Sequence, residues 1–196
     1  MENSPENGFD GKTPRHHEHV CPMWLAPFLS TPLRRLFQNP KRIIAPYLAP
    51  GQSAADIGCG PGYFTIPMAE RAGANGKVYA IDLQTEMLEL VRQAAEKAGV
   101  QERVIPVTAQ SNTLNFNEKV DFALSFWAAH EVPDQLNFFR EVVGMLKPGG
   151  KFLLIEPKLH TEEEYMTDAR DLLVSLGLRH LGPVDVRLSM AMVFEK

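Results

Sequence analysis

The middle of the chain alternates between short apolar runs and longer segments whose apolar residues recur at helical spacing. Runs of this kind, bounded by Gly, Pro and polar residues, favour buried strands. We expect five strands, at Ser53 to Ile57, Val78 to Ile81, Val104 to Val107, Val120 to Phe126 and Phe152 to Ile155. We expect helices between them, at about Tyr63 to Ala72, Gln84 to Ala98 and Gln135 to Leu146. This repeated order predicts a doubly wound α/β fold, with a parallel sheet covered by helices on both faces.

Both ends of the chain add to this pattern. Before the first strand, residues 32–48 predict short helices, interrupted where Asn39 precedes Pro40. After the fifth strand, Thr161 reads as the N-cap of a helix that continues to about Leu176 and stops at Gly177. The terminal stretch RHLGPVDVRLSMAMVFEK has room for two more strands.

Composition limits the classes of protein that this chain can belong to. With 196 residues, 44% of them hydrophobic and 22% charged, one domain with a substantial core is expected. The net charge of −4 makes nucleic acid an unlikely partner. No apolar run approaches the roughly 20 residues of a membrane helix, and MENSPENGFDGK lacks the apolar centre of a signal peptide. We therefore expect a cytoplasmic protein without membrane contact, in which Cys21 and Cys59 are thiols.

Polar residues follow the predicted strands at the ends where ligands bind. In doubly wound sheets, the ligand crevice lies outside the carboxyl ends of the strands. The residues that the pattern brings to this edge are Asp56, Asp82, Gln110, Ser111, Ser125 and His130. One crevice can hold all of them.

The glycine loop after the first strand distinguishes between cofactor classes. It reads Asp56-Ile-Gly58-Cys-Gly60-Pro-Gly62. A dinucleotide loop, G-x-G-x-x-G, would need its third glycine at the next position, which is Tyr63. No Gly-Lys-Ser/Thr follows, so a Walker loop is excluded. We expect Gly62 to begin a helix whose N–H groups face an anion such as a carboxylate.

These motifs, in this order, resemble one family. D-x-G-x-G-x-G after a first strand, an acid after the second strand, and LKPGGKFLLIEP at the fifth are similar to class I S-adenosylmethionine-dependent methyltransferases. The resemblance covers residues 47–157 and is to the small-molecule type, with a domain like methyltransferase domains 11 and 25. It implies a Rossmann-like, mostly parallel sheet of seven strands, completed by an antiparallel hairpin at the C-terminus.

The resemblance also implies a cofactor site for S-adenosylmethionine, with S-adenosylhomocysteine as product. The glycines would admit the methionine part of the cofactor, while Asp56 holds its ammonium and Asp82 accepts bonds from both ribose hydroxyls. Many relatives have an acid after the third strand, where this chain has Gln110 and Ser111 as candidates for adenine recognition. The implied cofactor residues are Asp56, Gly58, Gly60, Gly62, Asp82, Leu83, Met87, Gln110, Ser111 and Ser125.

The fourth strand bears on the acceptor. Enzymes that methylate base amines usually carry an Asn- or Asp-Pro-Pro-aromatic turn here, whereas this chain reads SFWAAHE. The HEVP element resembles that of small-molecule methyltransferases, which makes His130 and Glu131 candidate catalytic residues. His130 can instead cap the following turn, and Glu131 can pair with a surface cation. An alcohol acceptor would need a base such as His130, whereas a thiol, with a reference pKa of about 8.5, would not.

The stretch HHEHVCPMW near the N-terminus is rich in soft ligand atoms. We expect residues 1–20 to form a flexible arm, residues 21–48 a helical lid segment, and residues 49–196 the cofactor-binding domain. The lid would present His19, Cys21, Trp24 and Phe28 to the pocket, with Cys21 as a third catalytic candidate on the acceptor side. His19 and Cys21, together with His130, could present ligand atoms to a substrate or to a metal. A structural zinc site usually needs four ligands, and this stretch lacks a regular paired spacing, so we expect no metal.

The sequence thus predicts an enzyme that methylates a small molecule, with a thiol, a metalloid or another soft nucleophile as acceptor. One alternative is a non-catalytic cofactor-binding module that docks a partner through Arg34, Arg35, Lys41 and Arg42. Another alternative is a methyltransferase that acts on RNA or on a protein. The pattern does not choose the acceptor or the oligomeric state.

Overall fold

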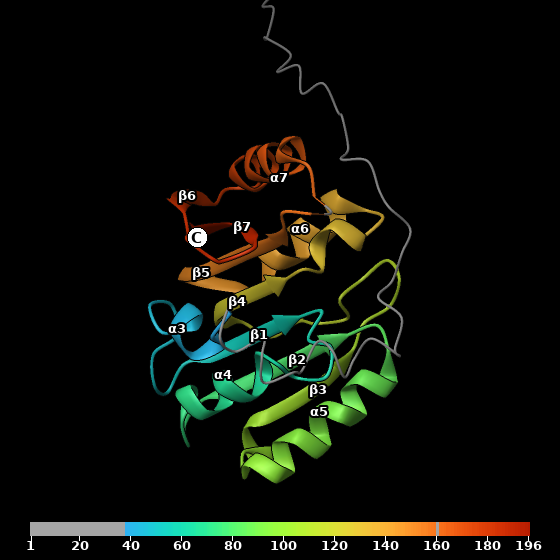
Figure 1. Ribbon diagram of the computed structural model, residues 1–196, viewed down its shortest axis with the longest axis vertical. Helices are drawn as coiled ribbons and strands as arrows, with labels where there is room; N and C mark the ends of the chain where they lie inside the picture. Colours follow the sequence, from blue (N-terminus) through green and yellow to red (C-terminus); the bar gives the residue numbers. More distant parts are fainter. Residues whose placement is uncertain (1–37, 160) are drawn as a thin grey trace, which may run out of the picture.

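A computed structural model describes residues 38–159 and 161–196. Its centre is a seven-stranded sheet in the order β3-β2-β1-β4-β5-β7-β6, which runs from bottom to top in Figure 1. The strands are β1 (Ser53–Ile57), β2 (Lys77–Asp82), β3 (Val104–Thr108), β4 (Val120–Phe126), β5 (Leu146–Pro157), β6 (Arg179–Pro183) and β7 (Ser189–Glu195). Strands β1 to β5 are parallel, and β7 is antiparallel to both β5 and β6. The predicted doubly wound sheet with its C-terminal hairpin is confirmed.

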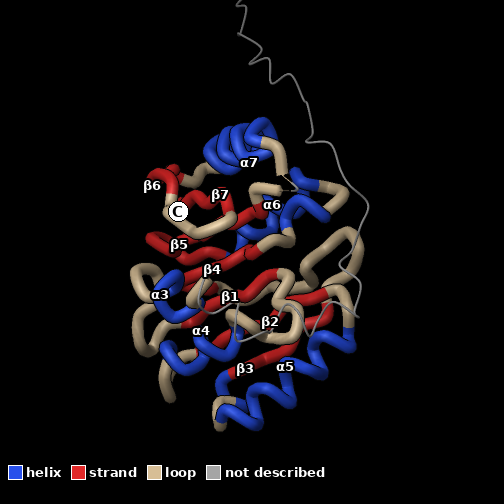
Figure 2. The backbone as a smooth tube through the Cα atoms, viewed as in Figure 1, coloured by secondary structure: helices blue, strands red, loops and turns tan. Residues whose placement is uncertain are grey.

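Helices cover both faces of this sheet (Figure 2). They are α3 (Pro40–Ile44), α4 (Thr65–Ala72), α5 (Thr85–Ala98), α6 (Gln135–Met145) and α7 (Glu163–Ser175), with 3-10 turns η2 (Gln101–Arg103) and η3 (Ala129–Glu131). Successive strand residues point to opposite faces. Accordingly Ala54 and Leu153 join the core under α3, α4 and α5, whereas Ala55 and Leu154 join the core under α6 and α7. Because the central strands are buried on both faces, they read as continuous apolar runs.

Two predicted helix starts are wrong. Helix α4 begins at Thr65, and Gly62 instead lies in a turn, where its φ is 90° and its N–H donates to the Cys59 carbonyl over 3.1 Å. Helix α7 has Glu162 as its N-cap rather than Thr161. The Thr161 hydroxyl is buried without a hydrogen-bond partner among the described residues, so it does not cap the helix.

The described part of the predicted lid segment belongs to the core. The break at Asn39 and Pro40 is present, and the Asn39 side chain caps α3 by accepting from the Lys41 N–H over 3.1 Å. Ile44 and Leu48 are fully buried among the residues of β1 and α4. Residues 38–48 therefore help to build the domain. The predicted arm of residues 1–20, and His19, Cys21, Trp24 and Phe28, lie outside the described residues.

Strand β5 is longer than its apolar run. It continues through Glu156 to Pro157, so Glu156 lies within the strand and not beyond its end. In the part of the chain that the structure describes, no helix is both long enough and apolar enough to span a membrane.

Candidate active site

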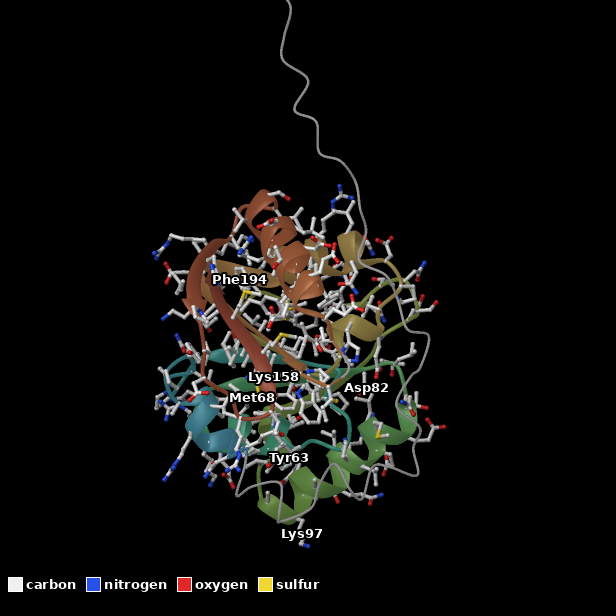
Figure 3. The ribbon with its side chains drawn as sticks, turned by 45° about the horizontal axis from the view of Figure 1, so that its top comes forward. Tyr63, Met68, Asp82, Lys97, Lys158 and Phe194 are labelled. Carbon is white, nitrogen blue, oxygen red and sulfur yellow. The ribbon has the colours of Figure 1, made fainter. Side chains whose placement is uncertain are left out.

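A cavity of about 570 Å³ lies at the carboxyl ends of the parallel strands. The ends of β1 and β2 and the loops that follow β1, β2, β3 and β4 line it, and Figure 3 labels Tyr63 of the first loop and Asp82 at the end of β2. The predicted site residues that line the cavity are Asp56, Gly58, Gly60, Asp82, Leu83, Met87, Gln110, Ser111, His130 and Glu131. The fold thus brings residues from the carboxyl ends of four strands and the loops that follow them to one space, as the strand-end rule predicts.

Two predicted cofactor residues do not line the cavity. A Cβ on Gly62 would lie 3.3 Å from the Val91 side chain of α5, so Gly62 serves close packing of the loop on that helix. Ser125 is completely buried within β4, beside Ile57 of β1 and Leu154 of β5. Its hydroxyl has no hydrogen-bond partner among the described residues. The cavity lining does not include these two residues, and their roles in cofactor binding stay predictions.

The glycine loop is held against two neighbouring strand ends. The N–H groups of Gly58 and Cys59 donate to the Ile81 carbonyl of β2, over 2.9 and 3.1 Å. Gly58 has a φ of 69°, and a Cβ there would lie only 2.3 Å from the Cβ of Ala128 in the loop after β4. Only glycine meets both requirements. The bare backbone of this loop forms part of the cavity wall.

Asp82 joins the glycine loop to the start of α5. Its Oδ2 accepts from the Gly60 N–H over 2.8 Å, and its Oδ1 accepts from the Gln84 N–H over 2.9 Å. Burial raises the pKa of Asp82 while these backbone donors oppose the rise. A carboxylate can accept about four hydrogen bonds, so the side chain can also accept from hydroxyl groups of a ligand.

Asp56 lies deeper, at the end of β1. Its side chain is almost fully buried, and its Oδ2 accepts from the Thr65 hydroxyl over 2.6 Å. Burial raises the pKa of Asp56 to about 7, and the negative charge of Asp82 adds to the rise, although the Thr65 hydroxyl opposes it. Two carboxyl groups at one end of a cavity favour a cationic ligand group, because a cation stabilises both of their ionised forms.

The other end of the cofactor region is more apolar. Leu83 is 47% exposed and Met87 is buried, and both line the cavity. Gln110 pairs its backbone N–H and carbonyl with Thr113, which closes a tight turn that also contains Ser111. This arrangement suits a flat ring with polar edges.

Cys59 is a packing residue of the loop. Its Sγ lies 3.9 Å from Asp82 Oδ2, and burial together with the charges of Asp56 and Asp82 raises the pKa of the thiol well above its usual value. A thiol in such surroundings is not a nucleophile at neutral pH.

His130 lies in the turn η3 and contacts the carboxylate of Glu156 from β5. Its Nδ1 is 2.5 Å from Glu156 Oε2, and its backbone N–H donates to Glu156 Oε1 over 3.3 Å. Burial would lower the pKa of His130, but the hydrogen bond and charge of Glu156, together with the charge of Glu131, outweigh it and raise the pKa. The sequence signal that points to Glu156 is an acid at the end of an apolar run, as at Asp56 and Asp82.

One wall of the cavity depends on distant parts of the chain. Trp127 has a φ of 58°, and its Nε1 donates to the Ser189 hydroxyl of β7 over 3.0 Å. Tyr63 donates its hydroxyl to the Gln38 carbonyl over 2.8 Å, and the Gln38 amide donates to the Arg187 carbonyl over 3.0 Å. The C-terminal hairpin and the segment before α3 therefore support the aromatic residues Tyr63 and Trp127, neither of which was predicted.

The fold and the site define a class of protein. A glycine loop after β1, an acid at the end of β2, and this strand order are the features of class I S-adenosylmethionine-dependent methyltransferases. The family described as "Methyltransferase domain" matches residues 55–154, and the chain belongs to this family.

Individual relatives agree with this class. The chain is 31% identical over 107 residues to the demethylmenaquinone methyltransferase of Anoxybacillus flavithermus, a match that covers 54% of this chain and 45% of that protein. The chain thus spans about half the length of the curated relatives it matches.

Solved structures share the fold. A SAM-dependent methyltransferase from Aquifex aeolicus superposes with a TM-score of 0.80 at 23% identity, covering 90% of this chain and 99% of that chain. A methyltransferase from Pyrococcus furiosus gives a TM-score of 0.65 at 22% identity, with 86% and 84% covered. At these identities the likeness shows the common fold.

Proposed function

We propose that this chain transfers a methyl group from S-adenosylmethionine to a nucleophilic atom of a small molecule. The observation that carries the proposal is the cavity in which Asp82, bonded to the glycine loop, and the buried Asp56 face one space. The curated relatives are named for the methylation of demethylmenaquinone, which supports a small-molecule acceptor.

The cofactor would be held by groups that match its parts. Asp56 would meet the ammonium of the methionine part, and the backbone of Gly58 and Gly60 would allow its close approach. Asp82 would accept bonds from the ribose hydroxyls. Leu83 and Met87 would contact the adenine, and Gln110 or Ser111 would bond to its polar edge.

The chain's own residues would have to bind, align and exclude water. Bound S-adenosylmethionine supplies a methyl carbon that its positive sulfur already activates. Alignment of two reactants alone is worth about 7 to 11 kcal/mol of the barrier. His130 and Glu131 line the same cavity and are the catalytic candidates on the acceptor side.

The N-terminal segment that contains His19, Cys21, Trp24 and Phe28 is proposed to cover the acceptor side. Gln38, where the described chain begins, is buried and bonded to Tyr63 of the cavity wall. The described part of the chain therefore begins beside the cavity wall. The partner-docking alternative receives less support, since Lys41 pairs with Glu70 over 2.7 Å.

Replacement of Asp82 tests the cofactor site. Asp82→Ala should weaken binding of S-adenosylmethionine and S-adenosylhomocysteine by about tenfold or more, because up to two charge-assisted hydrogen bonds of about 1.5 to 3 kcal/mol each are lost. Titration calorimetry on the full chain measures this affinity. Asp171→Ala is the matched control, because Asp171 is exposed and bonded only to the neighbouring Arg170 in the described structure. Equal affinities for the two variants would remove Asp82 from the site.

Turnover tests the reaction itself. The full chain with S-adenosylmethionine and a panel of thiols, phenols and arsenite should release S-adenosylhomocysteine with at least one acceptor. Failure of the parent protein to bind either cofactor form would contradict the proposal at its first step.

A further inference from the structure

The turn that carries His130 rests on a buried polar network. Gln135, the first residue of α6, is fully buried, and its amide donates to the carbonyls of Ala129 over 2.6 Å and Val132 over 2.8 Å. Tyr165 of α7 donates its hydroxyl to Gln135 Oε1 over 2.9 Å. Two helices thus fix the backbone on both sides of His130.

Glu156 fixes the ring of the same residue. Both of its carboxyl oxygens contact His130, one at the backbone N–H and one at Nδ1, and the Glu156 side chain is 0% exposed. With the carboxylate as acceptor, the neutral ring carries its proton on Nδ1. The Nε2 lone pair is then the one that can accept a proton, on a residue that lines the cavity.

The charges around His130 favour proton uptake. Glu156 of β5 and Glu131 of η3 both raise the pKa of His130 above its ordinary value, against the effect of burial. Burial, with the charge of Glu156 in addition, raises the pKa of the Tyr165 hydroxyl of α7 well above the usual range, so Tyr165 stays neutral. Among the described residues, no Lys or Arg forms an ion pair with Glu156. A buried carboxylate is costly unless it is paired, and here its partner is His130.

We propose that the acceptor is a compound with a phenol-like hydroxyl, whose proton His130 takes while Glu156 acts as the positioning residue. The inference rests on the proposed methyl transfer and names the acceptor class for it. A thiol, with a reference pKa of about 8.5, ionises near neutrality without help, whereas a phenol like that of Tyr, with about 10, stays protonated. A cavity built only for thiols would need no oriented base.

The step balances without another reactant. The acceptor O–H bond breaks, and its proton moves to His130 Nε2, which forms an imidazolium beside the Glu156 carboxylate. The oxygen electron pair forms the new bond to the methyl carbon. The electrons of the broken sulfur–methyl bond remain on sulfur, which leaves neutral S-adenosylhomocysteine and a methyl ether.

The first test needs no acceptor. NMR of the full chain labelled at histidine nitrogens should show His130, assigned by the signal lost in His130→Gln, as the Nδ1–H tautomer in its neutral form. Its titration midpoint should lie above about 6.5, the ordinary value, and should fall in Glu156→Gln. An Nε2–H tautomer, or an unmoved midpoint, would overturn the pairing.

The second test separates a positioning role from a structural one. With aromatic acceptors that share one skeleton and carry either a hydroxyl or a thiol, the parent should methylate the hydroxyl compound, and kcat/KM should rise with pH through the His130 pKa. His130→Gln should lower kcat by about 10²-fold or more, the usual range for a general base. Glu156→Gln should lower kcat by about tenfold and move the rising limb to lower pH, while acceptor KM and S-adenosylhomocysteine affinity stay unchanged.

The control variant is Asp171→Ala, which removes an exposed carboxylate of α7 that pairs only with the neighbouring Arg170 in the described structure, and it should keep the parental pH dependence of kcat/KM. If Glu156→Gln does not fold, Glu156→Asp keeps the charge at a greater distance. In that variant kcat/KM should rise with pH at a midpoint between those expected for the parent and for Glu156→Gln. Transfer to the thiol alone, at a rate that Glu156→Gln leaves unchanged, overturns this inference but leaves methyl transfer intact. Loss of cofactor binding by the parent would instead overturn the proposed function.

Discussion

Asp56 makes the folded protein sensitive to pH. Its folded-state pKa of about 7 stands well above the ordinary value of 3.8, because the carboxyl group is buried with one hydroxyl partner and a second carboxylate nearby. A pKa raised by folding means that the native state favours the protonated form. The associated stability is fully present below the unfolded pKa and is lost as pH rises through about 7.

Asp56→Asn should remove this dependence. The parent should lose up to about 4 kcal/mol of unfolding free energy relative to the variant between pH 4 and pH 8, at 1.36 kcal/mol for each unit of pKa. The Asn side chain keeps an oxygen to accept from the Thr65 hydroxyl. Urea unfolding of the ligand-free protein across this pH range measures the difference. Parallel pH profiles for parent and variant would contradict the shift.

At the scale of elements, the C-terminal hairpin completes both the core and the site. Strand β7 pairs with β5, so that Met190 lies beside Glu156 and Ser189 beside Pro157. Phe194 of β7, labelled in Figure 3, is fully buried and stacks on Phe152 at 6.3 Å between ring centroids. The hairpin therefore acts on the site through the strand that carries Glu156.

Phe194→Ala should destabilise the fold by about 3 to 5 kcal/mol, the usual cost of removing a buried Phe. Because Phe194 does not line the cavity, affinity for S-adenosylhomocysteine should persist at temperatures where the variant remains folded. Leu181→Ala on β6 is the control, since Leu181 is partly exposed and should change stability by about 0.5 kcal/mol or less. Urea unfolding measures the stability of each variant, and calorimetry measures its affinity for S-adenosylhomocysteine. A Phe194→Ala variant that is as stable as the parent but has lost affinity would contradict both expectations.

At the scale of the whole molecule, the donor and acceptor sides of the cavity should depend on different parts of the chain. Removal of residues 1–28 should lower methyl transfer more than cofactor affinity, because in the proposed arrangement the glycine loop would hold the donor while a lid would exclude water and position the acceptor. Removal of residues 1–15 is the control and should leave both unchanged. Transfer assays and calorimetry give the two readouts.

If the chain without residues 1–28 transfers methyl groups at the parental rate, these residues do not act as a lid. If Cys21→Ser alone abolishes transfer while the cofactor still binds, the Cys21 thiol acts directly on the acceptor side.

The sequence by itself determined the features that local chemistry encodes. Apolar runs separated by helical spacing defined the five parallel strands, because a strand buried on both faces must be apolar throughout. The order of strands and glycines placed Asp56 and Asp82 at one edge, since parallel strands end together. The sequence does not determine which way each residue of a loop points, and Gly62 packs on α5.

Only the tertiary structure decided which distant residues meet. His130 and Glu156 are 26 positions apart, and Trp127 and Ser189 are 62 apart. Their contacts depend on how far β5 extends and on how β7 aligns with it, which side-chain patterns along the chain do not encode. Burial also belongs to the fold, because desolvation by surrounding elements, and not the residue type, raises the pKa of Asp56. The placement of Asp56 and Asp82 at one edge is thus a property of the sequence order, whereas the pairing of His130 with Glu156 is a product of packing.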